Sequence, residues 1–543
     1  MSQKLSFTSN NLPLKLILWF REIDLPQENL ATTTATAGAL LTVVLTTAFL
    51  WKQRSSRKEF ARIPTPKGCY PLIGHLLTIG PNRMKKFHQW HKELGPIFYI
   101  MTGNKPTLVI ADPYMTHELL VTNGRVTSDR FHGSVRHDFG SNKELGLILS
   151  PPDKQRNNKR KAVLNALGPR KLQDVSPVLC KEAEEFADMV SSGKNTNPIP
   201  YLLRTSFNFI LLTLCGERTT SIDDPLYKRS LDMIKTTIKY TDFKYTFMQL
   251  INPSLAKIVR PFILGSEADV KQLVFQHYEY TLNPFYLEMI QKALESGEDN
   301  LIKALNDDMN QGKRGSYNNL LPSIHDVINA GTDTTAMTIA WGFLILSTKP
   351  DAQKKIQQEI DTFANEHNGR LPDFSERSKV PYLTAAQREC FRIRPTTDLG
   401  VIHEAAEDFE WRGNLIPAGT FFMANMVEVH MDPVKYSNPE EFRPERFLDK
   451  ANDSMFASAN HKVDQRDQFN FGWGRRLCVG AHLAEDQMFN VWVQTLYKCD
   501  IKPALDENGN EILATLETVP PAAGPIVAGP EPFEIRFVPR NKT

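Results

Sequence analysis

Cys478 stands in a short segment whose residue types suit the binding of a metal by a thiolate. Residues 471–480 read FGWGRRLCVG, and the residues that follow place apolar side chains at helical spacing. A helix that begins just after the cysteine directs free backbone N–H groups toward the sulfur, and Arg476 adds a positive charge. We therefore expect an easily deprotonated thiol that is a good metal ligand, with Gly474 and Gly480 leaving room for a bulky group. The ordinary alternative for a lone cysteine is a buried structural residue beside a turn.

Asp333 and Thr334 place an acid and an alcohol side by side in an otherwise apolar stretch. They belong to residues 330–335, AGTDTT, which the apolar run AMTIAWGFLIL follows. Such a pair could relay the two protons that activation of O2 requires. The commoner role for an Asp-Thr pair in a helix is a solvated or back-bonded polar turn.

One long helix is expected to carry this pair. Ser323 with Asp326 three residues later is a capping-box pattern, and no proline follows until Pro350. A helix longer than about 25 residues, which must cross a large core, is therefore predicted. Short β signals occur elsewhere, at residues 97–110, 410–423 and 533–538. The fold class that we expect is mainly α with small β-sheets.

The composition is that of a folded protein without a strong preference for charged partners. Of the 543 residues, 41% are hydrophobic and 23% are charged, and the net charge is +2, so no nucleic-acid partner is expected. The six cysteines are too few and too scattered for a disulfide framework, and no C-x-x-C pair indicates structural zinc. We therefore expect the main part of the chain to be reduced and cytosolic.

An uncharged stretch at residues 31–51 separates a short N-terminal segment from the rest of the chain. At ~1.5 Å per helical residue it spans a bilayer core of ~30 Å. Basic residues follow it at once, whereas residues 1–30 are charge-balanced, so the positive-inside bias places the remainder in the cytosol. We expect a lumenal segment (1–30), one transmembrane helix (31–51), a basic and proline-rich hinge (52–71) and a single domain (72–543). A buried helix and a cleaved signal peptide are the alternatives.

The segment around Cys478 resembles the haem-binding signature of the cytochrome P450 family, F-x-x-G-x-R-x-C-x-G. Every fixed position is matched, by Phe471, Gly474, Arg476, Cys478 and Gly480. Residues 330–335 are similar to the family's oxygen-binding motif, A-G-x-[DE]-T-T. Residues 381–395 resemble its E-x-x-R helix, and residues 438–447 resemble its P-E-R-F segment. The motifs fall in the family's order, and the resemblance covers nearly the whole chain.

The resemblance implies a cytochrome P450 fold in which residues 72–543 bind haem b. Cys478 is then the axial ligand of the iron, and its thiolate favours cleavage of the O–O bond. Arg476 is expected on a haem propionate, and Phe471, Gly474 and Gly480 are expected to shape the cofactor loop.

The same resemblance assigns roles to six residues outside the loop. Gly331 would let the long helix open beside the iron, Thr334 would be the catalytic hydroxyl, and Asp333 would be the catalytic acid. Alone, Glu389 and Arg392 would form a surface pair worth a few tenths of a kcal/mol. The resemblance instead places them with Arg446 in a buried ionic triad that fixes the core around the haem loop.

Two positions depart from the family's pattern. Where the family usually has Trp-x-x-x-Arg, this chain has Arg156 and Arg160, so Arg160 can still reach a propionate but the aromatic partner is absent. His403 occupies a position where many relatives carry Arg or His, and we expect it on a propionate as well. An ordinary hydrogen-bonded histidine is the alternative.

The predicted activity is that of a monooxygenase that inserts one oxygen atom from O2 into a lipophilic small molecule. The chain has no flavin or nicotinamide fingerprint, so the resemblance implies NADPH-cytochrome P450 reductase as the electron donor, and cytochrome b5 as an optional second one. Its character is that of a eukaryotic, fungal enzyme of the endoplasmic reticulum membrane. Steroids, fatty acids, terpenoids and xenobiotics all remain open as substrates.

Two other functions stay open, and a third has no support. The first is an isomerase or lyase that acts on a peroxide, a type of relative that often lacks the acid-alcohol pair. The second is a non-enzymatic haem carrier or sensor. A serine hydrolase is not supported, because the sequence has no G-x-S-x-G elbow.

Overall fold

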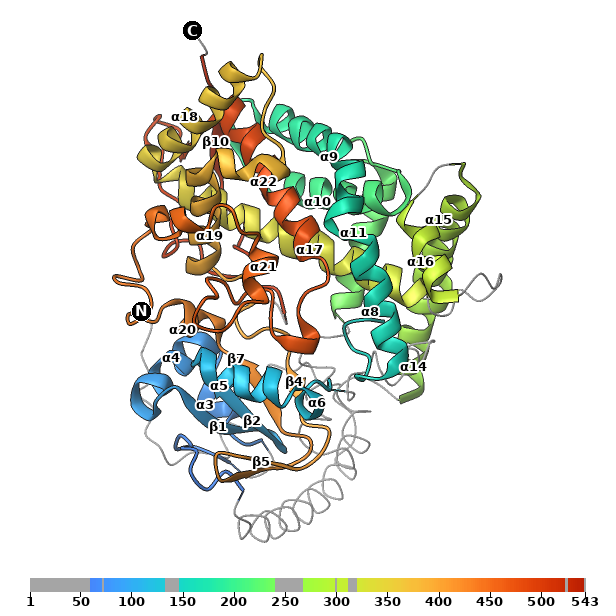
Figure 1. The fold of residues 1–543 in the computed structure, drawn as a ribbon, viewed down its shortest axis with the longest axis vertical. Coiled ribbons are helices and arrows are strands. Elements are labelled where there is room, and N and C mark those ends of the chain that lie inside the picture. Colours follow the sequence, from blue (N-terminus) through green and yellow to red (C-terminus); the bar gives the residue numbers. More distant parts are fainter. Residues whose placement is uncertain are drawn as a thin grey trace, which may run out of the picture.

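The computed structural model describes residues 59–70, 73–131, 146–239, 267–297, 300–310, 320–522 and 526–541. Helices dominate this part of the chain and small sheets complete it, which confirms the predicted fold class (Figure 1). The predicted N-terminal segment, the predicted transmembrane helix and most of the basic half of the hinge lie outside the described residues. Among the helices that are described, none is long and apolar enough to cross a bilayer.

The strands of the described part form three small sheets. The first has the order β1-β2-β7-β4, and its strands are β1 Ile97–Thr102, β2 Lys105–Ile110, β7 Phe421–Ala424 and β4 His403–Glu404. The second has the order β3-β10-β8-β9, from β3 Asn195–Thr196, β10 Ile535–Pro539, β8 Cys499–Leu505 and β9 Glu511–Ile512. The third pairs β5 Phe409–Trp411 with β6 Asn414–Ile416. All three predicted β segments therefore contain strands.

The first sheet and the short helices beside it form one region of the molecule, and longer helices form the rest (Figure 1). The helices up to the centre of the chain are α3 Leu76–Ile79, α4 Arg83–Leu94, α5 Pro113–His117, α6 Gly124–Thr127, α8 Lys154–Ala166, α9 Pro169–Val190, α10 Ile199–Cys215, α11 Pro225–Lys239, α14 Glu267–Gln276, α15 Asn283–Glu295 and α16 Leu301–Asn310. They are followed by α17 Leu320–Ser347, α18 Pro350–Glu366, α19 Pro381–Ile393, α20 Met426–His430, α21 Met455–Ala459 and α22 Ala481–Lys498. Short segments of π-helix (η1 Glu118–Thr122, η2 His277–Leu282) and of 3-10 helix (η3 Phe374–Lys379, η4 Pro444–Lys450, η5 Gly474–Arg476) lie between them.

Helix α17 passes through the middle of the helical region and carries the predicted acid-alcohol pair (Figure 1). It has 28 residues, so the prediction of one long helix is confirmed. The predicted cap is wrong, because the helix already includes Leu320 and Ser323 is buried inside it. The carboxylate of Asp326 accepts the backbone N–H of Ile148 at 3.0 Å instead, so it ties a distant loop to the helix.

Candidate active site

The loop that carries Cys478 is closed by its own backbone and packed against α19. The N–H of Cys478 donates to the carbonyl of Phe471 at 2.8 Å, and the Phe471 ring meets the Phe391 ring edge-on at 5.4 Å between centroids. Gly474 has a φ of 51°, and a Cβ there would come within 2.9 Å of the Leu120 carbonyl oxygen. A side chain at position 474 would therefore push the loop away from η1.

Cys478 has accessible surface although protein surrounds it. It is an exposed cysteine, yet desolvation raises the pKa of its thiol above the usual value. A hydrogen bond to the Gly480 backbone and the charge of Arg160 act in the opposite direction but do not prevail. The prediction of an easily deprotonated thiol is therefore wrong for the protein alone, and the charge of a bound metal would be needed to hold the thiolate.

The arginine that acts on the sulfur is also not the predicted one. Arg160, on α8, is the cation that lowers the pKa of Cys478. Arg476 donates to main-chain carbonyls instead, through Nε to Ser128 at 2.7 Å and through Nη2 to Ser150 at 2.6 Å. These bonds hold the Cys478 loop against the two segments that precede α8.

Four arginines from three separate parts of the chain form one cationic cluster, which we call the arginine cluster: the buried Arg130, Arg156 and Arg476 and the half-buried Arg160. Desolvation followed by mutual repulsion lowers the pKa of Arg156 to about 10 and that of Arg476 to about 9. Desolvation, together with the charges of Arg476 and Arg156, lowers the pKa of Arg130 well below its usual value. Asp129 and Asp153 offset only part of this charge.

Donors in the arginine cluster are left without acceptors. Nε of Arg130 and Nη1 of Arg156 are buried and have no hydrogen-bond partner in the part of the chain that the structure describes. A buried donor without an acceptor is costly, and so is a surplus of buried positive charge. A bound group with two carboxylates would satisfy both, and the two propionates of haem have this chemistry. The described residues therefore fit a haem whose propionates lie at the arginine cluster.

His403 lies beside the arginine cluster, as predicted for a propionate ligand. Its Nδ1 is 3.0 Å from the carbonyl of Thr127, an acceptor that requires a proton on Nδ1. Desolvation, then the charge of Arg130, lowers the pKa of His403 well below its usual value. The ring is therefore neutral at physiological pH, and Nε2 carries no proton in this tautomer. To donate to a propionate through Nε2 the ring would have to take up a proton, which the negative charge of a propionate favours.

Helix α17 exposes a short stretch in the middle of an otherwise buried element. Ala330 is exposed, and Gly331, Asp333 and Thr334 are half-buried. The hydroxyl of Thr334 donates to the Ala330 carbonyl at 2.7 Å, which is the back-bonded arrangement. Burial raises the pKa of Asp333 to about 6, and Lys235 on α11 opposes that shift. An acid with this pKa can both take up and release a proton near neutral pH.

Gly331 has a packing role in this structure. A Cβ at this position would clash with the Cδ1 atom of Ile210 on α10. The absence of a side chain therefore allows close approach of α10 and α17. The prediction that this glycine lets the helix open toward the iron is not met, since α17 is an uninterrupted α-helix from Leu320 to Ser347.

Glu389, Arg392 and Arg446 meet in the core, as the family resemblance implied. Arg392 donates through Nε and Nη2 to the two carboxylate oxygens of Glu389, at 2.8 and 2.9 Å. Arg446 donates through Nε to Glu389 at 3.2 Å. All three side chains are at most 6% exposed, so the ions are paired out of contact with water. Arg392 also donates to the carbonyls of His430 and Pro439, which ties α19 to the chain ahead of the P-E-R-F segment.

The cytochrome P450 family model matches residues 64–524. The chain belongs to the cytochrome P450 family. It is 27% identical to cytochrome P450 monooxygenase 79 of Postia placenta, over 94% of this chain and 95% of that protein. It is likewise 27% identical to cytochrome P450 2C70 of rat, over 90% and 96%, and to 3-hydroxyphenylacetate 6-hydroxylase of Emericella nidulans, over 89% and 90%. This cytochrome P450 is accordingly a haem-thiolate oxidoreductase that uses O2.

Two members of the arginine cluster were not predicted as haem ligands. Arg130 donates to the carbonyls of Val401 and Ile402, the latter at 2.6 Å, and so joins the chain before α8 to the strand that carries His403. Arg156 donates to the carbonyls of Leu147 and Arg475. Nothing near Arg130 in the sequence marks it as a ligand, because its role depends on residues some 270 positions away.

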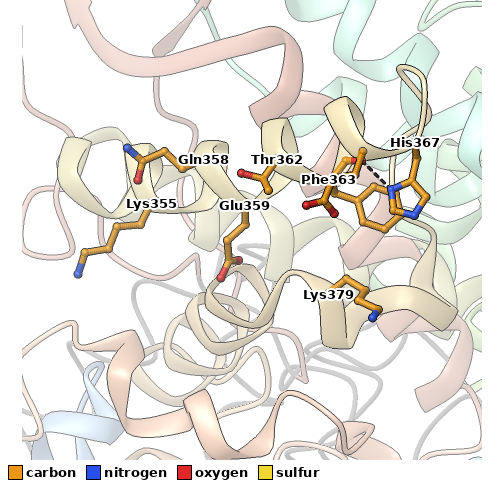
Figure 2. Close-up of a pocket in the computed structure, with 8 residues that line it drawn as sticks. Lys355, Gln358, Glu359, Thr362, Phe363, His367 and Lys379 are labelled. Atoms are coloured by element: carbon orange, nitrogen blue, oxygen red, sulfur yellow. Dashed lines mark hydrogen bonds between the residues drawn. The ribbon is translucent and has the colours of Figure 1, made fainter.

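A groove on the surface of this cytochrome P450 is separate from the active site. It has a volume of about 370 Å³ and runs along α18, between Lys355 and His367. Figure 2 shows the side chains along it, with His367 bonded through Nδ1 to the carbonyl of Phe363 at 2.8 Å. Glu359 accepts the backbone N–H groups of Tyr382 and Leu383, which caps α19. No predicted site residue lines this groove. Glu359, which lines it, already has a structural role as the cap of α19.

Proposed function

We propose that this cytochrome P450 inserts one oxygen atom from O2 into a lipophilic small molecule, with Cys478 as the thiolate ligand of haem b. The observation that carries the proposal is the pairing of two features. A cysteine with accessible surface lies beside the buried arginine cluster, which lacks enough acceptors of its own. A thiol supports metal ligation, and surplus buried guanidinium groups support binding of two carboxylates.

The protein residues would divide the work as follows. Arg130, Arg156 and Arg160, with His403, would hold the propionates and orient the cofactor. When bound, haem ligated by a thiolate supplies the electron density that favours O–O bond cleavage. Arg476 contributes charge to the arginine cluster, while its own donors hold the loop.

Proton delivery is assigned to α17. With a pKa of about 6, the Asp333 carboxyl is partly protonated near neutral pH and can pass a proton inward from solvent. The Thr334 hydroxyl already donates to the Ala330 carbonyl, so its oxygen is oriented and can accept a further hydrogen bond. An isomerase or lyase that acts on a peroxide would have no use for this pair.

The sequence also supports proposals for the electron donor and the location. The chain has no flavin or nicotinamide fingerprint, which supports NADPH-cytochrome P450 reductase as the donor, with cytochrome b5 as an optional second one. The uncharged stretch at residues 31–51 and the basic residues after it support a single anchor in the endoplasmic reticulum membrane. Two of the relatives are named monooxygenase and hydroxylase, which supports hydroxylation or epoxidation as the reaction.

The test is reconstitution of the full-length chain with reductase, NADPH and ¹⁸O2. A panel of steroids, fatty acids, terpenoids and arylacetic acids is offered, and products are examined for ¹⁸O by mass spectrometry. We expect at least one labelled product and a red-shifted ferrous carbonyl spectrum. Cys478→Ala should lose both, whereas the control Cys69→Ala, a half-buried cysteine outside the site, should keep both. A red-shifted spectrum in Cys478→Ala would refute the assignment of the ligand, and turnover of a lipid hydroperoxide without NADPH would favour an isomerase or lyase.

A further inference from the structure

The Cys478 loop has a buried carboxylate on each side of it. Asp467 lies four residues before Phe471 and is 4% exposed. Glu485, in the second turn of α22, is 3% exposed. Neither belongs to the P450 motifs matched above. Buried carboxylates are rare unless they are bonded, so each should have a specific partner.

The partner of Asp467 is Arg388 on α19, which is 1% exposed. Nη1 of Arg388 donates to Oδ2 of Asp467, and Nη2 donates to the carbonyl of Asp453. The other carboxylate oxygen of Asp467 accepts the hydroxyl of Ser458. A further contact joins α19 to the segment before the Cys478 loop, because Nε2 of Gln468 donates to the Arg388 carbonyl at 3.0 Å. The chain that enters the Cys478 loop is thus fastened to α19 by side chain and backbone.

Glu485 fastens the chain that leaves the loop. Its two carboxylate oxygens accept the backbone N–H groups of Met455 at 2.8 Å and Phe456 at 2.6 Å, at the start of α21. Burial raises the pKa of Glu485 to about 7, and these two hydrogen bonds and the charge of Arg388 oppose that shift only in part. The chain that leaves the loop is therefore fastened to α21 by a buried acid.

The two charged groups on α19 are neighbours in sequence and have opposite surroundings. Glu389 is an acid bonded to two bases, Arg392 and Arg446, whereas Arg388 is a base bonded to the acid Asp467. Successive residues on a helix point about 100° apart, so the two groups serve different faces of α19. One face holds the P-E-R-F segment and the other holds the Cys478 loop.

We propose, on the basis of the proposed function, that the buried Arg388–Asp467 ion pair and the hydrogen bonds of Glu485 to α21 together position the Cys478 loop for thiolate ligation. Arg388, Asp467 and Glu485 are positioning residues: the Glu389 triad organises the core, and these three residues set where the sulfur lies.

The experiment uses the full-length chain loaded with haem. The variants are Asp467→Asn and Arg388→Gln, and the control is Asp188→Asn. Asp188 is 60% exposed and bonded to Lys498 at the far end of α22, so the control removes a carboxylate from an exposed ion pair away from the Cys478 loop. Three quantities are measured: total haem, helix content by circular dichroism, and the fraction of the ferrous carbonyl complex with the red-shifted band of thiolate ligation.

We expect Asp467→Asn and Arg388→Gln to lower the red-shifted fraction at least fivefold at unchanged helix content, and Asp188→Asn to leave it unchanged. Arg388→Lys keeps the charge but cannot reach both Asp467 and the Asp453 carbonyl, so it should recover part of the loss. Equal red-shifted fractions in all variants would overturn the inference. So would a parallel loss of helix content and of the red-shifted band, because that would show a global role. A wild-type chain without the red-shifted band would instead refute the proposed function.

Discussion

The Glu389 triad and the arginine cluster are both buried and charged, but they differ in how their charge is balanced. In the triad, the Glu389 carboxylate accepts donors from Arg392 and Arg446, and the remaining donors reach main-chain carbonyls. In the arginine cluster, cations face one another, and buried donors are left without acceptors in the described part of the chain. Balanced buried charge indicates a structural role, whereas surplus positive charge indicates a binding site for an anionic group.

The largest expected effect is the loss of folding free energy on breaking the Glu389 triad. Arg392→Gln leaves the Glu389 carboxylate with too few donors in a site that excludes water, which should cost roughly 3–5 kcal/mol of folding free energy. We expect a large fall in the urea midpoint and little haem-loaded protein. Arg370→Gln is the control, because Arg370 forms a similar two-bond pair with Glu376 but is 50% exposed. Similar midpoints for the two variants would contradict the distinction.

A smaller effect, on haem binding and not on folding, is expected from breaking the arginine cluster. The Arg160 side chain forms no hydrogen bond to other described residues and is repelled by Arg156, so Arg160→Gln should not destabilise the haem-free chain. Haem affinity should fall roughly tenfold, the loss expected for one charge-assisted hydrogen bond to a partly screened carboxylate. Haem transfer to an acceptor protein and thermal unfolding of the haem-free protein measure the two quantities. Destabilisation of the haem-free chain at unchanged haem affinity would place Arg160 with the structural residues.

The contrast also applies within α17, where the Thr334 hydroxyl is hydrogen-bonded and the Asp333 side chain has no hydrogen bond to the other described residues. Thr334→Ala removes one hydroxyl that donates to its own helix, so stability should change by less than about 1 kcal/mol. The red-shifted carbonyl spectrum should persist, while product formed per O2 consumed should fall several-fold. Thr338→Ser is the control, because it keeps the hydroxyl that bonds the Thr334 carbonyl one turn further on. Full coupling in Thr334→Ala would remove this residue from proton delivery.

The smallest expected effect is the pH dependence of Asp333. Burial raises its pKa to about 6, so the protonated form predominates below that pH and declines above it. Lys235 and Tyr227 are the other titratable groups whose charges act with it, and both lie on α11. Product formed per O2 should therefore decrease by a few-fold as pH rises from about 6 to about 8. In Asp333→Asn the coupling should be low and independent of pH; an unchanged pH profile would assign the titration to another group.

The sequence by itself determined the parts whose chemistry is local. The residues around Cys478, the uninterrupted run that forms α17 and the E-x-x-R spacing on α19 depend on neighbours along the chain. Helical spacing, glycine positions and motif order are visible there, so the fold class and the family could be predicted.

Only the tertiary structure decided what depends on distant partners. The arginine cluster gathers Arg130, Arg156, Arg160 and Arg476 from three separate segments, and no local pattern marks their surplus charge. Asp326 looked like a cap and bonds a distant loop instead. The pKa of Cys478 is raised because burial, which the sequence does not display, outweighs the nearby positive charge. Desolvation and pairing of charges are properties of the packed chain, and they distinguish residues with a structural role from residues suited to binding a ligand.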